Sequence, residues 1–158
     1  MKRTKIKADL NAYTFGEEIL LKGWVRTKRE SKNVVFVALN DGSVISNLQI
    51  VLDPSVFEAQ IFPKISTGAC LSVKGKLVES QGQGQSVELN AEEVEILGTA
   101  DPEKFPLQPK KHSLEFLREI AHLRPRTNTF SAILRIRHAM TFAVHKFFND
   151  RGFVNIHT

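Results

Sequence analysis

The sequence predicts a mainly β fold: a closed five-stranded Greek-key barrel, followed by a hinge and the helical start of an α+β domain. Three observations lead to this prediction. Five segments within residues 17–97 show the apolar–polar alternation of half-buried strands. A short helix is expected between the third and the fourth of them. After residue 98 the alternation gives way to prolines and then to a helical periodicity.

The first three strands are expected at residues 17–29, 34–39 and 44–52. A polar turn at residues 30–33 joins the first two. The next turn has the sequence Asn40-Asp41-Gly42. Glycine adopts positive φ without strain, and Asn and Asp side chains bond to nearby backbone, so this tripeptide strongly favours a turn.

A short helix is expected directly after the third strand. Asp53 is a typical N-cap residue, and Pro54 suits the first helical position, where its missing N–H would have no partner. The helix, with Val56, Phe57 and Ile61 as its apolar residues, is expected to end before Pro63, because the residue that precedes a proline is disfavoured in helical conformation.

The fourth and fifth strands are expected at residues 69–79 and 86–97, joined by a flexible turn at residues 82–84. Five strands with one short helix between the third and the fourth is the order of the OB-fold. The face formed by its second and third strands usually binds the ligand. Other small barrels share the strand count, so the position of the helix carries most of this assignment.

The pattern of the residues after the barrel predicts that the chain has three parts. Prolines 102, 106 and 109 predict an extended linker after the barrel. Helices are expected at residues 113–122 and 131–149, and residues 153–158 alternate like a strand. The expected parts are an OB-fold domain at 1–98, a hinge with a short helix at 99–130 and a truncated start of another domain at 131–158.

The positive charge of the chain is concentrated in particular segments rather than spread evenly along it. Its 158 residues carry 22 Lys and Arg against 17 Asp and Glu, a formal net charge of +5. Residues 1–98 contain 12 basic and 12 acidic side chains, so the whole excess lies beyond them. Within the neutral part, a cluster of cations is opposed only by Glu30, and a basic cluster favours a polyanion partner weakly. The cluster consists of Lys22, Arg26, Lys28, Arg29 and Lys32.

Several classes of protein are excluded. The longest apolar run, residues 34–39, is too short to span a bilayer, and the first residues do not lead into a secretion segment. A single cysteine, Cys70, excludes an internal disulfide framework and a multi-cysteine zinc site. His138 and His145 lie a heptad apart without an HExxH pattern. We therefore expect a cytoplasmic protein with no membrane partner and no metal.

The strand alternation places an aromatic, an amide and a carboxylate side chain together on the outer barrel face, bordered by cations. Single-stranded nucleic acid is bound by such a face, because bases stack on the ring, polar groups read base edges and cations hold phosphates. The structural alternative is that a loop covers the lone aromatic and that the cations form a solvated turn. The candidate RNA-binding residues are Phe36, Gln49, Glu88, Arg29, Arg26 and Lys28.

Four stretches resemble class II aminoacyl-tRNA synthetases of the aspartyl, asparaginyl and lysyl group. Residues 22–26 (KGWVR) and 47–54 (NLQIVLDP) are similar to the first strand and to the third strand with helix start of that group's barrel. Residues 115–128 (EFLREIAHLRPRTN) resemble the asparaginyl enzymes in particular, since the aspartyl enzymes usually have a Tyr-Leu-Asp-Leu-Arg type of sequence there. Residues 147–158 (FFNDRGFVNIHT) resemble motif 1, a helix and strand used for dimerisation.

The resemblance implies a role for each candidate residue in binding the anticodon loop of tRNA-Asn. Phe36 would stack on an anticodon base, and Gln49 would recognise the central uridine. Glu88 would lie near the first or third anticodon base. Arg29 would contact the tRNA, with Arg26 and Lys28 beside phosphates.

The family's motifs 2 and 3, which hold ATP and the activated amino acid, are absent from this sequence. The resemblance therefore implies an N-terminal fragment of an asparagine–tRNA ligase, with no catalytic residue and no cofactor of its own. The parent enzyme would be ATP-dependent and AMP-forming, would use Mg²⁺ and would form a homodimer through residues 131–158. Two alternatives stay open: a general single-stranded nucleic-acid-binding OB module without synthetase activity, and a dimerisation element built on residues 131–149.

Overall fold

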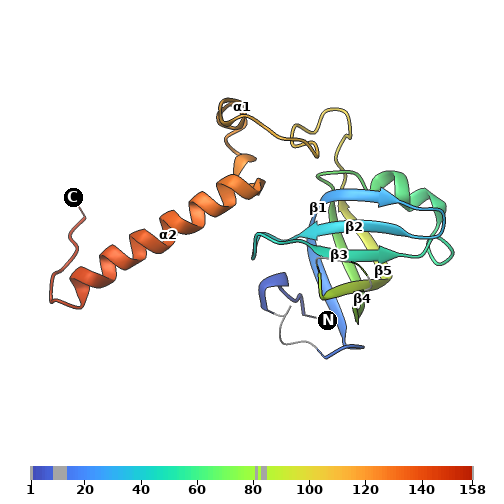
Figure 1. Ribbon diagram of the computed structural model, residues 1–158, viewed down its shortest axis with the longest axis horizontal. Helices are drawn as coiled ribbons and strands as arrows, with labels where there is room; N and C mark the ends of the chain where they lie inside the picture. The colour runs from blue at the N-terminus through green and yellow to red at the C-terminus, as the bar shows by residue number, and fades with distance from the viewer. Residues whose placement is uncertain (1, 9–13, 81, 83–84, 158) are drawn as a thin grey trace. The chain divides into compact units, whose positions relative to one another are not determined.

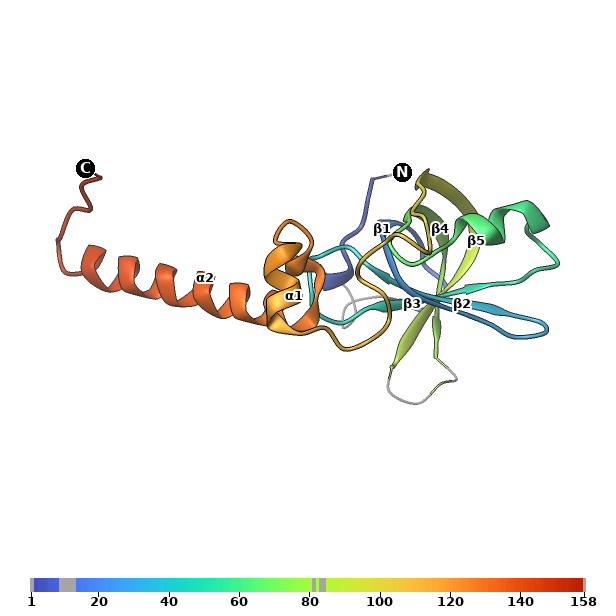
Figure 2. The same cartoon turned by 90° about the horizontal axis from the view of Figure 1, so that it is seen from above.

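The computed structural model describes residues 2–8, 14–80, 82 and 85–157. Figures 1 and 2 show a barrel formed by the first part of the chain and helices formed by the second part. The elements, in chain order, are η1 (Ile6–Ala8), β1 (Glu18–Glu30), β2 (Val35–Asn40), β3 (Leu48–Leu52), η2 (Ala59–Lys64), β4 (Cys70–Glu79), β5 (Val87–Gly98), α1 (Leu114–Glu119), η3 (Arg124–Arg126) and α2 (Asn128–Asn149).

The five strands close into a barrel with the order β1-β2-β3-β5-β4. All neighbouring pairs are antiparallel except β3 and β5, which run parallel. Because β5 lies between β3 and β4, the connection is a Greek key rather than a simple meander. The predicted OB-fold, with its helix between the third and fourth strands, is therefore confirmed.

The barrel interior is filled by the apolar residues of the strand alternation. Every second residue of β2 and β3 is buried, and the residues between them are half-buried on the outer face. Removing such a set of branched side chains from water is the main stabilising contribution to the fold. The buried set of these two strands is Val35, Val37, Leu39, Leu48, Ile50 and Leu52.

The helix between β3 and β4 differs from the expected one. Asp53 caps a local turn, since its Oδ1 accepts hydrogen bonds from the Ser55 N–H at 2.8 Å and the Ser55 hydroxyl at 2.7 Å. The helix proper is η2, a 3-10 helix that begins later and contains Pro63. Phe57, Ile61 and Phe62 pack against the barrel core, and this packing stabilises the segment despite the hydrogen bond that Pro63 cannot donate.

The turn predicted at Asn40-Asp41-Gly42 is present, with Gly42 at a φ of 79°. The Asn40 side-chain amide donates to the carbonyl oxygens of Val44 at 3.1 Å and Ser46 at 2.9 Å. These bonds hold a longer loop than expected, and β3 consequently begins at Leu48 instead of Val44. The other predicted turn, at residues 82–84, lies mostly outside the described residues.

The chain forms two compact units, Met1–Lys111 and His112–Thr158. Part of the expected hinge belongs to the first unit. The Ser66 hydroxyl donates to the Ala100 carbonyl at 2.6 Å, and the Phe105 ring lies against Gly68, where an added Cβ would be 2.7 Å from the ring. The segment that follows β5 therefore contacts the barrel as far as Phe105, and the first unit extends to Lys111.

The second unit contains α1 and α2, each with a side-chain cap. The Ser113 hydroxyl accepts from the Phe116 N–H at 3.2 Å, and the Thr127 hydroxyl accepts from the Phe130 N–H at 3.3 Å. Because Thr127 supplies the cap, α2 begins at Asn128, three residues before the expected start. No helix in the described part of the chain has the length and apolar character needed to cross a membrane.

The strand expected at residues 153–158 is not formed. Gly152, at a φ of 82°, follows the end of α2, and residues 153–157 have no regular secondary structure. A strand is stable only when a neighbouring strand satisfies its backbone hydrogen bonds. In the described residues, no second strand pairs with this segment.

Candidate nucleic-acid interface

The registers of the strands align two rows of side chains on the outer barrel face. In β1, Arg26 is the extra residue of a β-bulge between Val25 and Thr27, so the residues beyond it pair with β2 in a shifted register. The first row consists of Thr27, Ala38, Gln49 and Glu88, and the second consists of Arg29, Phe36, Val51 and Asn90.

Gln49 lies at the centre of this face, between a cation and a carboxylate. Its Oε1 accepts a hydrogen bond from Nη2 of Arg29 at 3.3 Å, and its Nε2 donates to Oε2 of Glu88 at 2.8 Å. The two contacts fix the orientation of the amide, because its oxygen faces the guanidinium and its nitrogen faces the carboxylate. One lone pair of the oxygen and one N–H of the nitrogen are left for a further partner.

Phe36 and Arg29 are directly opposite each other on β2 and β1. The Arg29 guanidinium carbon lies 5.6 Å from the centroid of the Phe36 ring, within the range of a cation–π interaction. Phe36 is half-buried and Arg29 is exposed. The Arg29 side chain thus accounts for part of the cover on the Phe36 ring.

Glu88 is on the outer face, as expected, but only 8% of it is exposed. Its Oε2 accepts from the amides of both Gln49 and Gln85, the latter at 3.3 Å. Burial of a carboxylate is unfavourable unless it accepts hydrogen bonds, and these amides provide them. Glu88 therefore serves as an anchor for the Gln49 amide in this structure.

Lys28 is directed away from the four residues described above. Its Nζ donates to the Phe62 carbonyl oxygen at 2.7 Å and forms an ion pair with Glu30 at 2.6 Å. The ammonium group thus joins β1 to η2. Arg26, as the bulge residue, has no residue opposite it on β2. The structure brings together Phe36, Arg29, Gln49 and Glu88, and it leaves Lys28 on a different contact.

Two residues of this face, Gln85 and Asn90, were not predicted from the sequence. Gln85, which also donates to the Ser80 hydroxyl at 3.2 Å, precedes β5, where no alternation indicates its direction. Asn90 is exposed and pairs with Val51. The alternation that placed Glu88 outward could have found Asn90 two residues later.

The side chains on this face are of the kinds that suit base recognition. They offer an aromatic surface, an oriented amide and an exposed guanidinium, which together suit stacking and base-edge hydrogen bonding. Among the described residues, no group of three or more His, Cys, Asp or Glu side chains could hold a metal ion.

A closed five-stranded barrel with this outer face has the architecture of an OB-fold nucleic-acid-binding protein. Residues 19–97, half of the chain, match the family of OB-fold nucleic acid binding domains, and the chain belongs to that family. Over its whole length the chain is homologous to asparagine–tRNA ligases, which confirms the resemblance found in the sequence.

The ligase of Cytophaga hutchinsonii is 60% identical over 160 residues, and that of Parabacteroides distasonis is 60% identical over 158 residues. Each match covers 100% of this chain and 34% of the relative. The chain thus spans about a third of the length of the curated relatives it matches. The asparaginyl-tRNA synthetase of Pyrococcus horikoshii has the same fold, with a TM-score of 0.85 at 20% identity over 99% of this chain and 36% of that chain.

Proposed function

We propose that this chain is the anticodon-binding part of an asparagine–tRNA ligase, and that the outer face of β1, β2, β3 and β5 binds the anticodon loop of tRNA-Asn. The observation that carries the proposal is the Gln49 amide, held between Arg29 and Glu88 beside the Phe36 ring. The names of the homologous relatives support the choice of tRNA as the nucleic acid.

Stacking on Phe36 is the first contribution to binding. An unpaired base presents a flat surface that can stack on the exposed part of the ring, and such a contact contributes about 1–3 kcal/mol. The Arg29 guanidinium, 5.6 Å from the ring centroid, can move aside or stack on the base itself. In either position its charge remains close to the phosphates of the loop.

Base-edge recognition by Gln49 is the second contribution. The amide keeps one donor and one acceptor position side by side after its contacts with Arg29 and Glu88. A uracil presents an N–H beside a carbonyl oxygen, so it forms two complementary hydrogen bonds with this amide. A cytosine presents the reverse order, an acceptor ring nitrogen beside a donor amino group, so at the same base position the fixed amide would face acceptor with acceptor and donor with donor. The proposed ligand of Gln49 is therefore the central uridine of the anticodon.

Phosphate contacts are the third contribution. Arg29 is exposed at the border of the face, and Arg26 lies nearby on β1. The Lys28 ammonium group is bonded to the Phe62 carbonyl and paired with Glu30, so it would have to leave these contacts to reach a phosphate. Binding that depends on phosphate neutralisation weakens as salt concentration rises.

The proposal extends to the parent protein. It would attach asparagine to tRNA-Asn in the cytoplasm with ATP and Mg²⁺, using catalytic groups that we assign to no residue of this chain. It would form a homodimer through residues 131–158. In support of the dimer, α2 carries an exposed apolar stripe that includes Ile133, Ile136, Met140, Val144 and Phe147.

A binding experiment with matched controls tests the role of this face. A labelled anticodon stem-loop of tRNA-Asn is titrated with the wild-type chain, with Phe36→Ala and with Gln49→Ala. We expect each variant to bind at least about fivefold more weakly, given about 1–3 kcal/mol per stacked base. The controls Phe15→Ala and Gln60→Ala remove side chains of the same two types from exposed positions elsewhere in the first unit. Both controls should bind the stem-loop like the wild type. Unchanged affinity in both Phe36→Ala and Gln49→Ala would contradict the proposal.

A second stem-loop, with cytidine in place of the central uridine, separates the two functional classes. A specific anticodon reader should bind it about tenfold or more weakly, because a mismatched base costs about 1–3 kcal/mol. A general single-stranded nucleic-acid-binding module would bind both RNAs equally well.

A further inference from the structure

A basic segment near the start of the chain is attached firmly to the barrel. The Thr4 N–H donates to the Leu20 carbonyl oxygen of β1 at 2.8 Å, and Thr4 and Leu21 form a parallel bridge. The Ile6 side chain belongs to the barrel core, with only 2% of it exposed. Residues 2–7 are therefore a structural part of the barrel rather than a loose extension of it.

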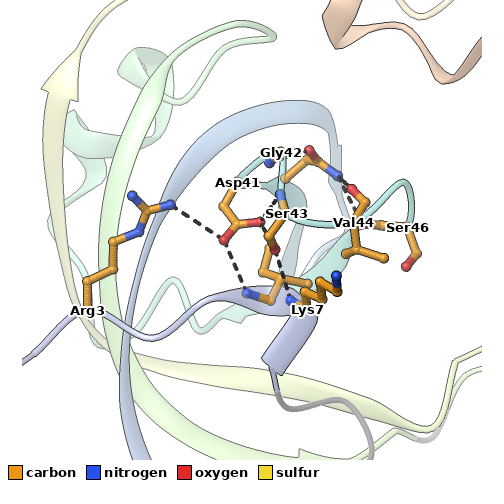
Figure 3. A network of polar contacts seen from close by, with 9 residues as sticks. Arg3, Lys7, Asp41, Gly42, Ser43, Val44 and Ser46 are labelled. Carbon is orange, nitrogen blue, oxygen red and sulfur yellow. Dashed lines mark hydrogen bonds and ion pairs between the residues drawn. The ribbon is translucent and has the colours of Figure 1, made fainter. Parts of the chain in front are cut away.

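Asp41, in the loop between β2 and β3, holds this segment from the other side (Figure 3). Its Oδ2 accepts from the Ile6 N–H at 3.1 Å and lies 3.4 Å from Nη2 of Arg3. The neighbouring Ser43 hydroxyl accepts from the Lys7 N–H at 2.9 Å. Because the Asp41 side chain is only 1% exposed, it offers no acidic surface to a ligand. It instead attaches residues 3–6 to the loop between β2 and β3, and we call this set of contacts the Asp41 clasp.

The side chains that this attachment displays are positively charged and exposed. They are Lys2, Arg3, Lys5 and Lys7, and we call them the basic segment. Arg3 has Asp41 as its ion-pair partner, whereas none of the three lysines has one among the residues that the structure describes. The backbone contacts thus hold like charges close together, an arrangement that a bound anion would relieve.

The basic segment lies at the opposite end of β2 from the candidate interface. Phe36 is near the first residue of β2, and Asp41 directly follows its last residue. At about 3.3 Å per strand residue, the five steps from Phe36 to Asp41 span about 17 Å. Along the axis of a nucleic-acid helix, one strand rises by about 3.4 Å per phosphate, so this span corresponds to about five phosphates measured along the axis.

We infer that the basic segment is a second RNA-binding surface, which contacts phosphates outside the loop whose bases lie at Phe36 and Gln49. The inference rests on the proposed function, because it takes the RNA bound at that face as its ligand. Fixing the segment on the barrel before RNA arrives lowers the entropy cost of forming the phosphate contacts. Its contribution is independent of base sequence and sensitive to salt.

The test compares two double variants of equal charge. Lys5→Gln with Lys7→Gln removes two cations of the basic segment. Lys74→Gln with Lys76→Gln removes two cations from β4 that are already paired with Glu18, Glu93 and Glu92. Each is titrated with the anticodon stem-loop and with the single-stranded loop alone, at several salt concentrations, after thermal unfolding has shown that it is folded.

The basic-segment variant should bind the stem-loop about tenfold more weakly, with a salt slope smaller by about 1.8, since each contact to a duplex phosphate contributes about 0.9. Its affinity for the loop alone should fall much less, because the inferred contacts are made to phosphates outside the loop. The control should match the wild type with both RNAs. Equal weakening in both variants, or equal loss with both RNAs, would overturn the inference.

Failure of this inference can be told apart from failure of the proposed function. If Phe36→Ala weakens binding and the basic-segment variant does not, only the second surface is wrong. If Phe36→Ala has no effect, the proposed function itself fails. A third variant, Asp41→Ala, removes one negative charge and also releases the segment. Affinity for the stem-loop should not rise, whereas a simple effect of net charge would raise it.

Discussion

At the scale of single residues, the barrel's outer face depends on one nearly buried carboxylate. Glu88 accepts two amide hydrogen bonds, and one of them sets the direction of Gln49. A hydrogen bond to a charged group contributes more than one between neutral groups. Under the proposed function, Gln49 would read the base and Glu88 would orient Gln49.

Replacing Glu88 by glutamine tests this division of roles. The neutral amide of Glu88→Gln can donate as well as accept, so it no longer dictates the orientation of Gln49. We expect the preference for the central uridine over cytidine to fall about tenfold, in line with the contribution of one hydrogen bond to a charged group. Binding of the two stem-loops measures this ratio. An unchanged ratio would show that Gln49 is oriented without Glu88.

Asp41 is the second residue whose environment gives a measurable prediction. Burial alone would raise its pKa, but hydrogen bonds from the Ser43 hydroxyl, the Ser43 N–H and the Ile6 N–H, with the nearby Arg3 charge, hold the pKa below 3.8. A carboxylate with a lowered pKa in the folded state stabilises the fold above its unfolded pKa of about 3.9. That stabilisation is lost as the pH falls through the folded value.

We therefore expect Asp41→Asn to have an unfolding free energy that depends less on pH below about pH 4 than that of the wild type. Chemical denaturation at a series of pH values measures the two curves. Above about pH 5 the curves should run parallel, with the variant less stable. Parallel curves over the whole acid range would contradict the assigned direction of the pKa.

At the scale of elements, the barrel closes through a close approach of β4 and β5. The register between the two strands shifts after Lys74, and Gly75 then pairs with Ala91. An added Cβ at Gly75 would overlap the backbone carbonyl oxygen of Asn90. The irregularity thus requires a residue without a side chain at this position.

Gly75→Ala should accordingly destabilise the barrel by about 3 kcal/mol, the upper part of the range for overpacked sites. Gly98→Ala is the matched control, because its added Cβ would meet only the Cys70 Cβ, at 3.8 Å. The control should change stability by no more than about 0.5 kcal/mol. Urea denaturation of the two variants decides the comparison. Similar unfolding free energies for Gly75→Ala and Gly98→Ala would show that β4 and β5 can move apart at Gly75 without destabilising the barrel.

At the scale of the whole molecule, the two compact units differ in how far they bury their apolar side chains. The barrel unit buries a complete core, whereas α2 leaves its apolar stripe exposed, with Ile136 65% exposed. An exposed apolar stripe of this kind favours association with another surface. We therefore expect the first unit to act alone in RNA binding and the second to act in assembly.

Residues 1–111, produced as a separate polypeptide, should unfold cooperatively and bind the anticodon stem-loop within about threefold of the full chain, a difference below 1 kcal/mol. Thermal unfolding and RNA titration provide the two measurements. A large loss of affinity in a folded fragment would mean that residues 112–158 contribute to the RNA-binding surface.

The proposed homodimer predicts a concentration-dependent increase in mass by analytical ultracentrifugation of the full chain. Ile136→Asp with Met140→Asp places charges in the centre of the stripe and should shift the chain to a monomer. RNA affinity per chain should stay the same, because both residues lie outside the first unit. A wild-type chain that remains monomeric at every concentration would contradict the proposed role of residues 131–158 in this chain.

The sequence by itself determined the strands, their buried faces and the outward direction of Phe36 and Gln49, because a period of two is a local property that each strand carries independently. It also predicted the turn at Asn40-Asp41-Gly42 and the chain's similarity to the asparaginyl enzymes. Local signals were misleading where packing competed with them: Asp53 caps a turn, and η2 passes through Pro63 because its apolar residues pack on the core.

Only the tertiary structure decided which side chains meet. Gln49 contacts Glu88, 39 positions further along the chain, because β3 and β5 pair side by side, and Lys28 bonds to η2 because that helix lies beside β1. The Asp41 clasp joins residues 35 positions apart in the chain. Hydrogen bonds and ion pairs depend on distances of a few ångströms between remote segments, and these distances are set by the closure of the barrel rather than by any periodicity of the sequence.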